Sequence, residues 1–191
     1  LDGLKSAIGL ELPRKIGGNL ILSSLESAEG LKLPEEIGGY LHLESLKSAK
    51  GLIFPRKIRS NLILSSLKSA EGLKLPEEIG GDLDIGDLKS AIGLELPRKI
   101  GGNLILSSLE SAEGLKLPEE IGGNLHLDGL KSAIGLELPR KIGGSLILSS
   151  LESAEGLKLP EEVLGFVYLD SLSEEERERL KKEYPNLQII P

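Results

Sequence analysis

The sequence contains no cysteine, methionine, tryptophan or threonine, and aromatic residues make up only 3% of its 191 positions. Without cysteine the chain cannot form a disulfide, a thiolate nucleophile or a cysteine-based metal site. Without threonine it cannot carry a threonine-lined ice-binding face. Stability must therefore come from the packing of aliphatic side chains, nearly all of which are leucine or isoleucine.

Long apolar runs are also absent, since no run exceeds four residues. A membrane-spanning helix needs about 20 consecutive, predominantly apolar residues, and the first residues lack the order of charged, apolar and small residues that marks a signal peptide. The formal net charge of −7 disfavours sequence-independent binding of nucleic acid, which requires a basic surface. We therefore expect a soluble chain with neither a membrane nor a nucleic-acid partner.

An internal repeat organises the whole sequence. Proline recurs at one constant interval, at Pro13, Pro34, Pro55, Pro76, Pro97, Pro118, Pro139 and Pro160. The first complete unit covers residues 10–30 and reads Leu-x-Leu-Pro-x-x-Ile-Gly-Gly-x-Leu-x-Leu-x-x-Leu-x-Ser-Ala-x-Gly. Such a period is typical of a solenoid, in which equivalent positions stack into columns and bury a continuous core. We predict an array of eight units over residues 1–172, paired as 42-residue units, with a C-terminal cap over residues 173–191.

Two Leu-x-Leu pairs in each unit predict its strands. In the first unit they occupy residues 10–12 and 20–22. Alternation with a period of two is typical of short strands with one buried face. The pair Gly17-Gly18 tolerates positive φ at a bend, and the proline after Leu12 cannot donate to a strand ladder. We therefore expect a mainly β repeat solenoid of short parallel strands separated by corners.

The two residues after each proline alternate between basic and acidic pairs, so the true period spans two units. Arg14-Lys15 is followed by Glu35-Glu36, and the alternation continues without exception to Glu161-Glu162. Stacking of coils about 4.8 Å apart then places opposite charges next to each other. Each exposed pair contributes only about 0.2–1 kcal/mol, so the expected effect is to avoid repulsion and to fix the register.

The last residues of the chain have the pattern of a capping helix. Ser173 and Glu176 have the spacing of a capping box, and acidic residues precede basic ones, as the helix dipole prefers. We predict a helix over residues 174–183, followed by an apolar strand-like segment. A polar helix with only Leu180 and Tyr184 turned inward suits a terminal cap that shields the last coil.

The repeat resembles a known family. The stretch Leu-Pro-x-x-Ile-Gly-Gly-x-Leu-x-Leu, for example residues 12–22, resembles leucine-rich repeat proteins, whose units have 20–29 residues with a strand on the concave side. The ending at residues 180–190 is also similar to a leucine-rich-repeat terminus. That family usually carries a backbone-bonding Asn or Cys where this chain has Leu25 and its equivalents. Both a horseshoe and a straighter β-solenoid therefore stay open.

The near identity of the units bears on origin and function. Residues 1–42, 85–126 and 127–168 barely differ, even at surface positions. Natural repeats usually drift, which favours a designed or consensus-derived array over a recently expanded natural one. The first functional hypothesis is a structural scaffold without catalytic activity or cofactor. The alternative is a natural leucine-rich-repeat module for protein–protein interaction, against which the near-invariant surface counts.

Residue types that often carry chemistry are not assembled into an expected catalytic or metal site. His42 and His126 share a repeat position but lie four coils, about 19 Å, apart, too far to share a metal or a proton. The serine-rich turns lack a nearby histidine to act as base, and the Gly-Gly pairs lack the lysine of a P-loop. The carboxylate pairs face opposite charges on adjacent coils. We therefore expect no enzyme.

Residues 43–84 form the one block that departs visibly from the others. Lys50 replaces Ile or Glu, Ile53-Phe54 replaces a charged residue and Leu, and Arg59-Ser60 replaces Gly-Gly. The resulting candidate protein-binding patch consists of Lys50, Ile53, Phe54, Arg56, Lys57 and Arg59. The alternative is that one coil keeps an idiosyncratic sequence without a binding role.

The first coil suggests a possible mode of self-association. The sequence begins at Leu1 in mid-coil, with Leu4 and Ala7 at core positions and no polar cap before them. An uncapped coil presents leucine side chains and unpaired strand N–H and C=O groups. We therefore expect self-association through the uncapped N-terminal coil.

Overall fold

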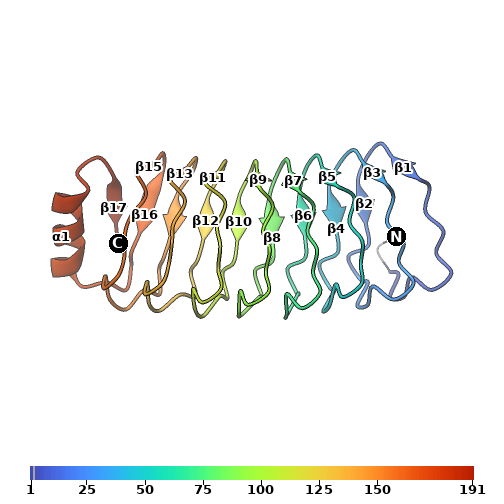
Figure 1. The fold of residues 1–191 in the computed structure, drawn as a ribbon, viewed down its shortest axis with the longest axis horizontal. Coiled ribbons are helices and arrows are strands. Elements are labelled where there is room, and N and C mark those ends of the chain that lie inside the picture. The colour runs from blue at the N-terminus through green and yellow to red at the C-terminus, as the bar shows by residue number, and fades with distance from the viewer. Residues whose placement is uncertain (2) are drawn as a thin grey trace.

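Each turn of the chain contributes one short strand to each of two parallel sheets. The computed structural model describes residues 1 and 3–191, and it is a β-solenoid of about eight turns closed by one helix, as the sequence predicts (Figure 1). The eight-stranded sheet contains β1 (Lys15–Ile16), β3 (Glu36–Ile37), β5 (Lys57–Ile58), β7 (Glu78–Ile79), β9 (Lys99–Ile100), β11 (Glu120–Ile121), β13 (Lys141–Ile142) and β15 (Glu162–Val163). The nine-stranded sheet contains β2 (Leu20–Ile21), β4 (Leu41–His42), β6 (Leu62–Ile63), β8 (Leu83–Asp84), β10 (Leu104–Ile105), β12 (Leu125–His126), β14 (Leu146–Ile147), β16 (Phe166–Tyr168) and β17 (Gln188–Ile190).

The positions of the strands confirm one sequence prediction and correct another. The strand predicted at residues 20–22 is present as β2, with a copy in every later turn. The strand predicted at residues 10–12 is wrong, because the other strand of each turn follows the proline, at β1 and its copies. Leu10 and Leu12 still pack against the core, and the N–H of Leu10 bonds to the carbonyl of Ala7 in a turn, at 3.0 Å. Alternation therefore reported which side chains face inward, and not which backbones pair.

The glycines of the bends act through close approach between coils. The Gly-Gly pairs do form bends, but positive φ occurs instead at the last glycine of each unit, such as Gly30 at 77°. A Cβ atom on Gly122 would lie 2.1 Å from the carbonyl oxygen of Gly101 in the preceding coil. Glycine at that point lets successive bends stack without a clash. The predicted bend at Gly17-Gly18 is therefore present, but it does not use the positive φ that glycine tolerates.

The hydrophobic core consists of columns of aliphatic side chains that run the length of the array. Leu20 stands in register with Leu41, and the same step continues to Leu146 and Val167. Leu104, in the middle of this column, is 0% exposed. Burial of one leucine contributes about 1.5–3 kcal/mol, so these columns are the main source of stability.

The cap forms as predicted. Helix α1 (Glu174–Glu183) begins with a capping box between Ser173 and Glu176, and Leu180 is its buried residue. Glu176 also accepts a hydrogen bond from the N–H of Ala154 at 2.9 Å, which ties the helix to the last coil. Strand β17 extends the nine-stranded sheet beyond β16. At the other end β1 and β2 are the outermost strands, and self-association through that coil stays a prediction.

Within the described part of the chain, no helix combines the length and the apolar character that a membrane span requires.

Candidate functional site

The eight-stranded sheet carries the predicted ladder of opposite charges. The ion pairs that join successive coils after the prolines are Arg14–Glu35 at 2.6 Å, Lys15–Glu36 at 2.6 Å, Arg56–Glu77 at 3.0 Å, Lys57–Glu78 at 2.9 Å, Arg98–Glu77 at 3.7 Å, Arg140–Glu161 at 2.9 Å and Lys141–Glu162 at 3.1 Å. The hydrogen bond from Lys15 lowers the pKa of Glu36. A general acid at neutral pH needs the opposite shift, so this arrangement suits a structural ladder better than acid–base chemistry.

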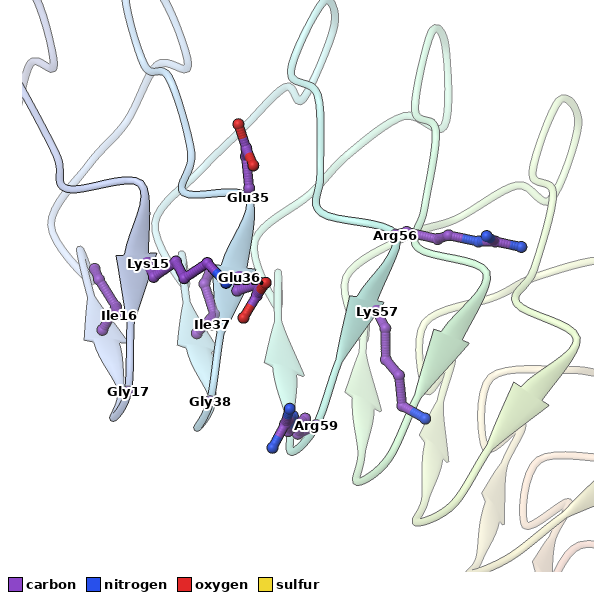
Figure 2. Close-up of a pocket in the computed structure, with 10 residues that line it drawn as sticks. All are labelled: Lys15, Ile16, Gly17, Glu35, Glu36, Ile37, Gly38, Arg56, Lys57 and Arg59. Carbon is purple, nitrogen blue, oxygen red and sulfur yellow. Dashed lines mark ion pairs between the residues drawn. The ribbon is translucent and has the colours of Figure 1, made fainter.

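A shallow recess on this side of the molecule contains part of the candidate patch. It has a volume of about 470 Å³, and Arg56, Lys57 and Arg59 line it together with Lys15 and Glu36. Figure 2 shows the side chains of Lys15 and Glu36 directed toward one another, whereas those of Arg56 and Lys57 extend toward the following coil. Four of these five side chains are thus engaged in ion pairs within the ladder.

The other members of the candidate patch lie apart from that recess. Lys50 is outside its lining and pairs with Glu71 at 2.7 Å. Ile53 is 83% exposed, whereas Phe54 is 9% exposed and belongs to the core. The structure therefore brings together only the three basic residues Arg56, Lys57 and Arg59.

A ladder of polar side chains, which sequence reasoning missed, joins the corners before the nine-stranded sheet. The Oδ1 atom of Asn103 accepts a hydrogen bond from the N–H of Asn124 at 2.7 Å. In five equivalent bonds the backbone N–H of one coil donates to a side-chain oxygen of the preceding coil. These bonds are Tyr40 N–H to Asn19 (3.0 Å), Asp82 N–H to Asn61 (3.0 Å), Asn103 N–H to Asp82 (2.7 Å), Ser145 N–H to Asn124 (2.7 Å) and Phe166 N–H to Ser145 (3.0 Å). An asparagine ladder thus exists, in a column other than the one occupied by Leu25.

The Gly-Gly pairs provide the room for this ladder. A Cβ atom on Gly123 would lie 2.5 Å from Oδ1 of Asn103, and one on Gly39 would lie 2.0 Å from Oδ1 of Asn19. The sequence signal was therefore a polar column directly after the recurring glycines. Its meaning depends on contacts between coils, which a pattern read along one unit does not show.

The two histidines lie on the outward side of the nine-stranded sheet and contact acidic residues of their own coils. His42 Nε2 lies 3.1 Å from Glu44 Oε2, and His126 Nδ1 lies 3.6 Å from Asp128 Oδ2. Over residues 1 and 3–191, no group of three or more His, Cys, Asp or Glu side chains is placed to hold a metal ion. Each histidine therefore belongs to a local pair on the sheet surface.

Comparison with family models, with curated proteins and with solved structures finds no match to this chain. The class of the protein therefore comes from its own architecture, which is a parallel β-solenoid of uniform turns with a helical cap.

Proposed function

We propose that this chain is a non-catalytic structural scaffold, a rigid rod of consensus-derived repeats of leucine-rich-repeat type. The observation that carries this proposal is the unbroken register of the nine-stranded sheet, in which each leucine of the Leu20 column stacks on its equivalent and the cap continues the same sheet. Coils joined in this way cannot shift singly without exposing leucine to water. The polar ladder and the ion pairs add a second set of bonds with the same step along the sequence.

The consensus-derived origin is supported by the near identity of three of the four alternate units, the exception being residues 52–72. Residues 10–30 and 94–114 are identical, and residues 136–156 differ from them only at Ser145. The affiliation with leucine-rich repeats rests on the unit length and on the Leu-x-Leu pair at the buried strand. Both are parts of the proposal.

Distances between spin labels test the scaffold directly. The chain has no cysteine, so Glu29→Cys/Glu155→Cys and Glu29→Cys/Glu113→Cys variants can each be labelled at two chosen sites. These pairs are separated by six and four coils, or about 29 and 19 Å at about 4.8 Å per coil. We expect narrow distance distributions that differ by about two coil spacings. Broad, overlapping distributions would show that the rod is not rigid.

A protein-interaction module is a second candidate, and one observation favours it. Residues 31–51, 73–93 and 115–135 are identical except at six positions of the unit. Five of those six fall within residues 40–45 and their equivalents, which form the strand of the nine-stranded sheet and the turn after it. Four of these five positions are half-buried or exposed, and only that of Leu43 is fully buried. Variation concentrated on one surface is typical of repeat proteins that bind a partner there.

A further inference from the structure

The strand face is the outward side of the nine-stranded sheet, formed by the columns that begin at Asn19, Ile21 and Ser23. Its middle column runs in register from Ile21 through His42, Ile63, Asp84, Ile105, His126 and Ile147 to Tyr168. The side chains of this column are all half-buried, between buried aliphatic residues on either side. The strand face is therefore a continuous surface along the rod.

Charge is distributed very unevenly between this face and the rest of the molecule. The three columns contain five acidic residues and no lysine or arginine, and the acidic residues are Glu44, Asp82, Asp84, Asp128 and Asp170. Subtracting these five from the 30 acidic residues of the chain leaves 25, against 23 basic ones. Most of the net charge of −7 thus lies on the strand face.

The acidic residues are also regularly spaced. Every second coil carries at least one carboxylate in these columns. The intervening coils carry Asn or Ser in the first column, Ile in the second and Ser in the third. Two coils correspond to about 9.6 Å along the rod. An extended polyproline II segment rises about 3.1 Å per residue with three residues per turn, so every third side chain returns to the same side after about 9.3 Å. The two spacings match over the four carboxylate-bearing coils.

Neighbouring side chains orient the carboxylates and add aromatic surface. Ser65 Oγ donates to Asp84 Oδ2 at 2.7 Å, and Ser107 Oγ donates to Asp128 Oδ2 at 3.1 Å. At the last coil Phe166 and Tyr168 form an edge-to-face pair with ring centroids 6.2 Å apart. Aromatic faces beside carboxylates attract guanidinium groups in particular.

We propose that the strand face binds an extended basic polypeptide segment that lies along the rod and carries arginine or lysine at every third residue. Four cationic side chains then meet the carboxylates of the four coils, one per coil, and the isoleucines between them contact the intervening residues of the segment. The inference rests on the second candidate function and goes beyond the scaffold role, which needs no such surface.

Binding of a synthetic peptide to the full 191-residue chain tests this proposal. The probe is a labelled 12-residue peptide of four Arg-Pro-Ser triplets, and the comparison peptide has the same composition with its four arginines contiguous. Titration by fluorescence anisotropy at low salt is expected to give a dissociation constant at least about tenfold lower for the triplet peptide, with a loss of affinity as salt screens the pairs. Equal affinities, or no binding of the triplet peptide, would overturn the proposal.

A matched pair of variants separates the strand face from general attraction to an acidic protein. The face variant combines Glu44→Gln, Asp84→Asn, Asp128→Asn and Asp170→Asn, which keep oxygen acceptors in place. The control combines Glu29→Gln, Glu113→Gln, Glu137→Gln and Glu155→Gln, which removes the same charge elsewhere. We expect only the face variant to lose binding, with unchanged circular dichroism in both. Equal losses would refute the assigned surface, while narrow spin-label distances in the same chain would leave the scaffold proposal standing.

Discussion

Removing one member of the polar ladder should destabilise the array at one defined amide. In Asn103→Ala the N–H of Asn124 loses the oxygen that accepts it at 2.7 Å. An N–H group left without a partner costs about 1–3 kcal/mol. The side chain of Asn103 is half-buried, so water can reach part of this corner, and we expect a loss near the lower end of that range.

The same column supplies a matched control. Ser145 occupies the equivalent position two coils later, and its hydroxyl accepts the N–H of Phe166 at 3.0 Å. Asn103→Ser therefore keeps an acceptor and should retain most of the stability that Asn103→Ala loses.

The assay combines urea unfolding with amide hydrogen exchange. Unfolding of a repeat array need not be two-state, so the exchange rate of the Asn124 amide is the decisive reading. We expect it to rise in the alanine variant more than in the serine variant, while amides at the two ends of the array change little. If both variants match the parent in urea midpoint and in Asn124 exchange, the ladder has no energetic role.

Three further perturbations test the core, the bends and the charge ladder. Leu104→Ala removes a side chain that is 0% exposed and should lower the free energy of unfolding in urea by about 2–5 kcal/mol. A loss of stability no larger than that of a surface substitution would contradict the claim that the leucine columns are the main source of stability. Gly122→Ala places a Cβ atom 2.1 Å from a carbonyl oxygen of the preceding coil, whereas a Cβ on Gly17 meets no atom within 4 Å. Only the first should lower the melting temperature. Replacing Glu77-Glu78 with Arg-Lys puts like charges on three successive coils, so its melting temperature should fall at low salt and recover with added salt. The hydrogen bond from Lys57 lowers the pKa of Glu78 from its ordinary value of 4.5. The stability that the ionised Glu78 contributes to the folded chain is therefore present above pH 4.5, and it is lost as the pH falls through the lower pKa of the folded state. When the pH is lowered, the variant without Glu77 and Glu78 should therefore lose less folding stability than the parent.

Much of the fold could be predicted because the repeat period fixes which residues stack. A constant step between prolines, without a slip, places Leu20 below Leu41 whatever the exact path of each turn, and the structure has that register. The helix was also predictable, since the spacing of Ser173 and Glu176 is a local signal whose bonds form within one turn of helix.

The features that were missed depend on contacts between coils or on the path within one turn. Strands Lys15–Ile16 and Leu20–Ile21 both have two residues. Only the second lies in a Leu-x-Leu pair, whereas Ile16 stands alone between charged residues and glycines and shows no alternation. The acceptor role of Asn103 is defined by a backbone group in the next coil. Phe54 belongs to the core because it stands at the inward repeat position of Leu12. Its position in the unit was therefore a better guide to burial than its chemical type.

Lengthening the array tests the central claim, which is that each repeat unit adds one coil to a rod of constant cross-section. A variant with a second copy of residues 85–126 inserted after residue 126 adds two coils. Small-angle X-ray scattering should then show a maximum dimension greater by about 10 Å, from two coils at about 4.8 Å, with an unchanged cross-sectional radius of gyration. Growth of the cross-section with no gain along the long axis would contradict the account.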